Sequence, residues 1–170
     1  MNLNSNENTS SQKLLTVLPP VTMEGLQTMR LARKEARTTH AREHFGYFLA
    51  YNLPRYVQCE FADFHYDMMA DVHDLLDLKI REVAWFMFGE SAKTSFAKGL
   101  ILYMIAYDIE PYINADAFDS TNSERILFDV VWELQKNKRF RDDFGEKYNT
   151  TRSASEVTQK RIKDFITNPT

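Results

Sequence analysis

Apolar side chains recur at helical spacing through much of the region before residue 80. Three helices are predicted, over about 23–38, 40–51 and 64–76. Thr22 stands where a hydroxyl can cap the first of them, and Pro54 interrupts the pattern after the second. The stretch 21–80 is therefore predicted to be a helical N-terminal region.

The pattern changes at Arg81. Glu82–Phe88 reads EVAWFMF, a short run rich in aromatic residues that is typical of a buried strand. A helix over about 94–107 should follow, apolar on nearly all sides from Leu100 onward and therefore buried. YINADAF at 112–118 is a second strand candidate.

Two capping-box patterns mark helices in the rest of the chain. Thr121 with Glu124 should open one helix, and Ser153 with Glu156 a last helix that ends near Thr167. The order of elements predicts an α/β fold, in which 81–170 forms the first part of an incomplete parallel sheet of the P-loop NTPase type. The parallel sheet is incomplete because the chain supplies only two or three strands.

Composition narrows the class of protein. Residues 1–20 are rich in Asn, Ser and Thr, which predicts a disordered tail. The net charge of −3 argues against attraction of nucleic acid by the whole molecule. Cys59 is the only cysteine, the start lacks the features of a secretory signal, and the longest strongly apolar run, Leu100–Tyr107, is too short for a bilayer. We expect an intracellular protein that does not enter the membrane.

The segment between the first predicted strand and its helix has the composition of a phosphate-binding loop. Such a loop needs inward-pointing backbone N–H groups, a helix N-terminus, a lysine for the phosphates and a hydroxyl for Mg²⁺. The ATP-binding residues predicted here are Gly89, Glu90, Ser91, Ala92, Lys93, Thr94 and Ser95. Lys93 should reach the terminal phosphates and Thr94 should ligate Mg²⁺.

The strict pattern G-x-x-x-x-G-K-[ST] is not met, because Met87 and Ala92 occupy the glycine positions. Alanine before the lysine makes a left-handed backbone less comfortable at that point. The alternative is an ordinary strand-to-helix turn with a solvated lysine. The order strand, loop and buried helix favours nucleotide binding.

Three segments, in this order, resemble the N-terminal ATPase region of phage large terminase subunits, the motors that package viral DNA. They are FADFHYDMM from Phe61, ESAKTSFAKGLILYMIAY from Glu90, and the long stretch INADAFDSTNSERILFDVVWELQKNKRFRDDFG from Ile113. Members of that family often carry alanine before the P-loop lysine. Many also carry an arginine in the loop where Gly89 stands here.

The resemblance implies an ATP-driven translocase in the host cytoplasm during virion assembly, with ATP and Mg²⁺ as cofactors. It implies double-stranded viral DNA, the portal and the small terminase subunit as partners, in a homo-oligomeric motor. The residues it places beside the adenine are Phe61, Phe64 and His65.

Hydrolysis also needs an acidic pair at the end of another strand, and no apolar run in strand context ends in one. ILFDVVWE at 126–133 has helical spacing instead. We therefore expect the chain to be the front part of the ATPase, without hydrolysis of its own. The other hypotheses are a helicase-like or AAA-like P-loop NTPase, and a non-catalytic helical module that binds a phage assembly partner through its basic first helix.

Two further features of the first helices give weak indications of a binding site. His40 and His44 are four residues apart and could share a metal, but no third ligand stands at a recognisable spacing, so an ordinary helix surface is favoured. The basic run 30–42 could touch DNA phosphates, although Glu35 interrupts it and a solvated face is favoured.

Overall fold

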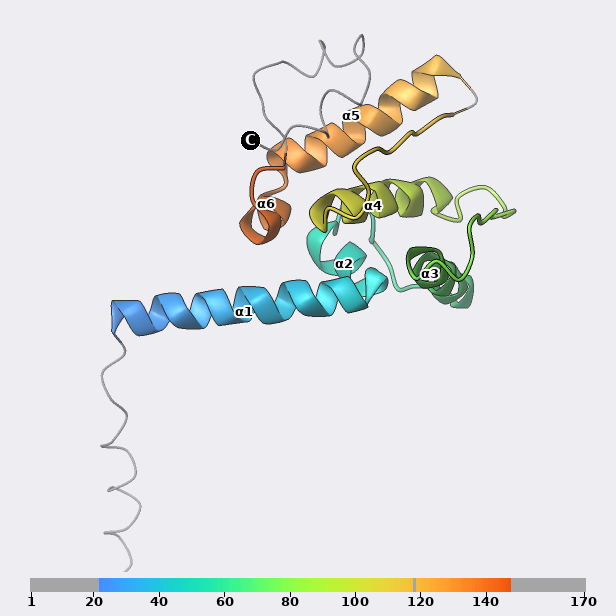
Figure 1. Cartoon of the computed structure of the whole chain (residues 1–170). Coiled ribbons are helices and arrows are strands. Elements are labelled where there is room, and N and C mark those ends of the chain that lie inside the picture. Colours follow the sequence, from blue (N-terminus) through green and yellow to red (C-terminus); the bar gives the residue numbers. More distant parts are fainter. Residues whose placement is uncertain (1–21, 118, 148–170) are drawn as a thin grey trace, which may run out of the picture. The chain divides into compact units, whose positions relative to one another are not determined.

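The computed structural model describes residues 22–117 and 119–147, which form six helices and no strand (Figure 1). The chain divides into two units, Met1–Ala36 and Arg37–Thr170, and helix α1 (Met23–Glu43) runs through the division. None of the helices in the described part is long and apolar enough to cross a bilayer. The tail expected at 1–20 and the helix expected from Ser153 lie outside the described residues.

The described part of the first unit is the beginning of α1. Thr22 accepts a hydrogen bond from the Gly25 amide through its hydroxyl, at 3.1 Å, so the predicted cap is confirmed. The side chains that follow are mostly exposed, among them Arg30, Arg33 and the apolar Leu31.

The second unit is built from the last turns of α1 and five further helices. They are α2 (Phe45–Asn52), α3 (Asp63–Leu76), α4 (Lys93–Ala106), α5 (Ser120–Lys136) and α6 (Lys138–Phe144). α4 packs against α2 and α5, while α2 also packs against α3 and α6. α4 is deeply buried, as its apolar sequence predicted, and it carries the candidate site at its first turn.

Aromatic rings fill the centre of this unit. Phe48 of α2 is fully buried and meets Tyr103 of α4 edge to face, with ring centroids 5.1 Å apart. Such aromatic pairs add to the stabilisation that apolar burial provides. Gly99 lets α4 approach α2 closely, because a Cβ there would lie 2.2 Å from Leu49 Cδ2.

The predicted α/β fold is wrong for the part of the chain that the structure describes. Neither 82–88 nor the described part of 112–118 is a strand. Side chains in 83–88 alternate between half-buried and exposed, with Phe86 95% exposed, so the segment is not the buried strand expected. The segment packs on one side only, and none of the described residues pairs with it in the hydrogen-bonded ladder that defines a sheet.

Helix limits also differ from those predicted at several points. α1 continues to Glu43, and the break comes at His44 rather than near residue 39. α5 is capped by Asp119, whose carboxylate accepts from the Asn122 amide at 2.7 Å, and not by Thr121. An aspartate one residue before the helix is an equally good cap, and its closeness to Thr121 made the two readings hard to separate from sequence.

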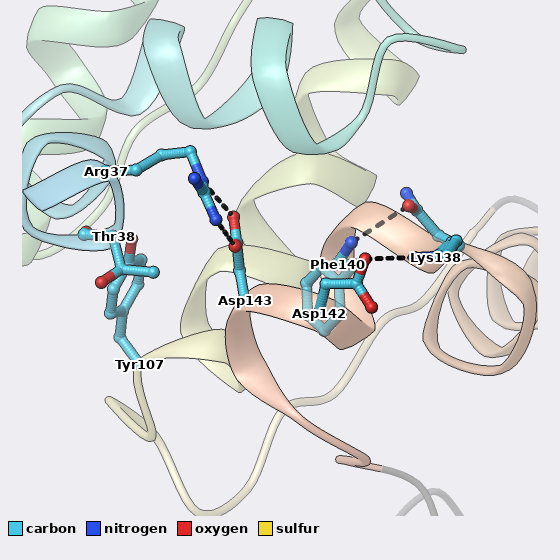
Figure 2. A network of polar contacts seen from close by, with 8 residues as sticks. Arg37, Thr38, Tyr107, Lys138, Phe140, Asp142 and Asp143 are labelled. Atoms are coloured by element: carbon cyan, nitrogen blue, oxygen red, sulfur yellow. Dashed lines mark hydrogen bonds and ion pairs between the residues drawn. The ribbon is translucent and has the colours of Figure 1, made fainter. Parts of the chain in front are cut away.

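A polar network connects the end of α1 to α6 (Figure 2). Arg37 donates two hydrogen bonds to the buried Asp143 carboxylate, one of them from Nε at 3.0 Å. Beside it, the Tyr107 hydroxyl donates to the Thr38 carbonyl oxygen at 2.8 Å. These contacts join segments more than sixty residues apart in the chain and so fix the second unit as a whole.

A second carboxylate, Glu133 of α5, is 1% exposed. Asn137 donates to its Oε2 at 2.7 Å, but its Oε1 accepts no hydrogen bond and lies 3.7 Å from Arg55. Burial raises the pKa of Glu133 above its ordinary value, and the Asn137 hydrogen bond and Arg55 offset only part of that effect.

Candidate nucleotide-binding loop

The predicted phosphate-binding segment forms the loop that enters α4. Before it, Trp85 donates from its indole Nε1 to Asp71 of α3 at 2.8 Å, which ties the extended segment 83–88 to that helix. The loop then turns and enters α4 at Lys93. The candidate residues are therefore brought together at a helix N-terminus, although the element before them is not the strand expected.

Lys93 folds back over the loop. Its ammonium donates to the Met87 carbonyl at 2.9 Å, to the Phe88 carbonyl at 2.7 Å and to the Ser91 hydroxyl at 3.0 Å. An ammonium has three N–H donors, so all of them are used inside the loop. Lys93 therefore differs from the lysine of an ordinary turn, whose ammonium is solvated.

The loop backbone is left-handed at two residues that are not glycine. Glu90 has φ 64°, and Ala92, the residue that caps α4, has φ 59° and ψ 12°. A left-handed conformation costs an L-residue roughly 1–2 kcal/mol. Ala92 thus adopts the backbone conformation for which glycine, required there by the strict P-loop pattern, is best suited.

The other loop residues differ in accessibility. Ser91 is buried and Thr94 is exposed in the first turn of α4, while Ser95 is half-buried. Gly89 is exposed, and a Cβ added to it would meet nothing within 4 Å, so a side chain fits there without a clash.

The aromatic segment predicted to flank adenine lies beside this loop. His65 stacks on Phe96 of the first turn of α4, with centroids 5.2 Å apart and planes inclined by 9°. Phe61 meets Phe96 edge to face at 6.2 Å, and Phe64 meets Phe88 in the same way at 5.6 Å. Residues some thirty positions apart in the chain are thus brought to one place.

The helix end of the loop favours an anion, although Glu90 and Lys93 balance each other in the charge of the whole segment 89–95. α4 has no acidic residue in its first turn, and Lys93 occupies its first position. A cation at a helix N-terminus is disfavoured by the helix dipole unless an anion is present. Glu90 is the one carboxylate of the segment 89–95, and it is exposed.

Sequence reasoning did not find the partners of Lys93. Two of them are main-chain carbonyls, of Met87 and Phe88, which every residue type supplies, so no sequence pattern could reveal them. It also missed Asp71, whose carboxylate anchors Trp85. A signal for that contact would require knowing that the extended segment lies on α3.

Comparisons of the chain with family models, with curated proteins and with solved structures found no match.

Proposed function

We propose that the chain binds ATP with Mg²⁺ at the loop 89–95. The observation that carries this proposal is the position of Lys93, whose ammonium is held over the loop at the N-terminus of α4 by three neutral oxygen atoms. Phosphate oxygens are charged acceptors and make stronger hydrogen bonds with an ammonium than carbonyl or hydroxyl oxygens do. Replacement of the loop oxygens by a triphosphate as the partner of Lys93 is therefore favoured energetically.

Helix electrostatics favours the same ligand. The first turn of α4 contains a lysine and no acid, and the free backbone N–H groups at a helix N-terminus attract anions. Thr94 follows directly with an exposed hydroxyl and is the residue that would ligate Mg²⁺. Charge and hydroxyl are thus arranged for a metal-bound polyphosphate.

The aromatic residues beside the loop suit a purine. Phe61, Phe64 and His65 lie against Phe96 and Phe88, which flank the loop on either side in the sequence. The His65 Nε2 atom is shielded from solvent and has no hydrogen-bond partner. Because His65 Nδ1 accepts from the Ala62 amide, the neutral ring carries its proton on Nε2, and a ring nitrogen of the base is one acceptor that would satisfy it.

The test is binding of a fluorescent ATP analogue, followed by anisotropy with and without Mg²⁺. Lys93→Ala should weaken binding at least about tenfold, because it removes a charge-assisted contact worth roughly 1.5–3 kcal/mol. Lys138→Ala is the control, since that lysine is exposed and pairs only within α6. Equal affinity of the wild type and Lys93→Ala would overturn the proposal.

We also propose, from the resemblance to large terminase subunits alone, that the bound ATP serves a viral DNA-packaging motor. In that role the longer protein couples ATP hydrolysis to movement of double-stranded DNA into the capsid. Its partners are the portal, the small terminase subunit and further copies of itself, in the host cytoplasm. Packaging assays with Lys93→Ala introduced into the phage test this role, and unimpaired packaging would contradict it.

A second candidate function has an observation in its favour. The regular elements of the described residues are all helices, as expected for a helical binding module, and α1 exposes Arg30, Arg33 and Arg42. This candidate predicts a chain that unfolds cooperatively and ignores ATP. Failure of the ATP analogue to bind a cooperatively folded wild-type chain would favour it over the nucleotide-binding loop.

A further inference from the structure

A cluster of three metal-ligating side chains lies at the junction of α1 and α2, remote in sequence from the loop. His40, Glu43 and His44 each offer one ligand atom, and these atoms all lie within 4.8 Å of one another. Glu43 is the third ligand that the spacing of the two histidines alone did not reveal. We propose that these residues form a site for a divalent transition-metal ion, with Zn²⁺ as the best fit.

The backbone keeps the three residues on one face. α1 ends at Glu43 and the His44 backbone is extended, but the His44 amide still donates to the His40 carbonyl at 3.0 Å and so closes the last turn of the helix. Residues at i, i+3 and i+4 of such a turn are neighbours on the helix surface. The main chain therefore places the three residues close together, and the rotamers of their exposed side chains set the final positions of the ligand atoms.

The side chains are available for a ligand. All three are exposed, and His44 caps α2 without using its ring for a capping hydrogen bond. The His40 ring is supported by Tyr47, edge to face with centroids 4.6 Å apart, and lies 4.5 Å from the His44 ring. Tyr47 thus holds His40 on the side that faces His44.

The cation that is adjacent in the sequence has an aromatic partner of its own. Arg42 lies between the ligands in sequence, but its guanidinium is placed over the Tyr107 ring, 5.6 Å from the centroid. Its charge is therefore engaged by an aromatic face. The Glu43 carboxylate brings negative charge to the cluster itself.

The donor set selects the class of metal. Two imidazoles and one carboxylate suit Zn²⁺, whereas Mg²⁺ and Ca²⁺ prefer sites made of oxygen alone. Zn–ligand bonds of about 2.0–2.2 Å require ligand atoms roughly 3.4 Å apart in a tetrahedron, which exposed side chains reach by small rotations. Water would fill the fourth position.

The experiment is a titration of the tag-free full chain with Zn²⁺ by calorimetry and with Co²⁺ by visible absorption. One ion per chain should bind, and Co²⁺ should show the absorption bands of a nitrogen- and oxygen-ligated ion. His40→Ala and His44→Ala should each lower the Zn²⁺ affinity more than about tenfold, because even outer contacts to a metal ligand are worth that much. Glu43→Gln should lower it by a smaller factor.

Cys59→Ser is the matched control, because Cys59 is an exposed free thiol and thiolates also bind Zn²⁺. It should bind Zn²⁺ like the wild type, and so should Lys93→Ala, which separates this site from the nucleotide loop. Melting temperatures in EDTA establish that the variants fold. Wild-type affinity in the double variant His40→Ala/His44→Ala, or no Zn²⁺ binding by the wild-type chain, would overturn the proposal.

Discussion

Ala92 has a left-handed backbone conformation at the candidate site, which is unfavourable for alanine. Its φ of 59° places its Cβ near the carbonyl oxygen that follows, and Glu90 two residues earlier is in the same region. Strain of this kind persists only where the surroundings impose it, and it is concentrated at functional sites. In this loop the ammonium of the next residue, Lys93, binds two carbonyl oxygens and one hydroxyl oxygen that precede Ala92 in the chain.

Ala92→Gly should raise the free energy of unfolding by up to about 1 kcal/mol, because glycine adopts a positive φ without steric cost. Ala97→Gly, at an exposed position within the same helix, should lower it by about 1 kcal/mol. Urea denaturation of both variants checks the opposite signs. A loss of stability in Ala92→Gly would mean that the left-handed cap is not strained.

Glu133 makes stability depend on pH in an unusual direction. Its pKa is higher in the folded chain than its ordinary value of 4.5, so the folded state binds the proton more tightly than the unfolded state does. The associated stability is fully present below pH 4.5 and is lost as the pH rises through the higher, folded-state pKa.

Glu133→Gln should therefore be more stable than the wild type at pH 7, because it removes a poorly paired buried charge while its side-chain oxygen can still accept from Asn137. The advantage should shrink as the pH falls toward 4.5, since the wild-type carboxyl then becomes neutral as well. Urea unfolding of both proteins at pH 7 and pH 4.5 measures it. An advantage that is the same at both pH values would contradict this assignment.

At the level of the helices, α4 packs closely on α2 because Gly99 has no side chain at their contact. Gly99 faces Leu49, which is 2% exposed and has no room to move. Gly46 faces Met69 instead, where the added Cβ would lie 2.6 Å from the sulfur atom. Methionine is flexible and can change its rotamer to make space.

Gly99→Ala should lower the free energy of unfolding by about 1–3 kcal/mol, as overpacking of a core does. Gly46→Ala is the matched comparison and should cost less, because Met69 yields and because alanine is a better helix former than glycine. Denaturant midpoints decide the order. Equal losses in the two variants would show that Leu49 is as mobile as Met69.

The periodic spacing of apolar residues made most of the helices predictable from the sequence. α3 and α4 lie within a residue of the limits expected from their apolar spacing, since each has a continuous buried face. The two strands were predicted wrongly because a run such as EVAWFMF fixes which side packs and cannot say whether another strand will pair with it. α6 was missed because its seven residues are too few to show a period.

The candidate site was predictable to a similar degree. Lys93 and the small residues before it identified the loop, and the family resemblance directed attention to Phe61, Phe64 and His65. The carbonyl partners of Lys93 and the metal-ligand role of Glu43 depend on main-chain geometry. Residue type carries no information about the carbonyl partners of Lys93 and little about the role of Glu43.

At the level of the whole second unit, Arg37 and Asp143 hold together the two ends of the described part of that unit. They are 106 positions apart, and the Asp143 side chain is 2% exposed. The hydrogen bond to Asp143 raises the pKa of Arg37 further above its ordinary value. The Arg37 guanidinium therefore holds its charge more firmly in the folded chain.

Arg37→Ala should lower the free energy of unfolding by roughly 3 kcal/mol, because it leaves the Asp143 carboxylate buried without its partner. Lys138→Ala removes the exposed pair with Asp142 in the same region and should cost less than about 0.5 kcal/mol. Thermal unfolding of both variants measures the difference. A small effect of Arg37→Ala would mean that water replaces the guanidinium beside Asp143.

The hydrogen bond from Trp85 to Asp71 gives the chain an intrinsic optical probe. Trp85 and Trp132 are its two tryptophans, and Trp85 stands two residues before the carbonyl that receives the Lys93 ammonium. Trp132 lies in α5 beneath the Arg55 guanidinium, 4.5 Å from its ring centroid. With Trp132→Phe, the tryptophan fluorescence of the protein would come from Trp85 alone. A rearrangement of the loop would then be measurable as a shift in the emission wavelength, without an added label.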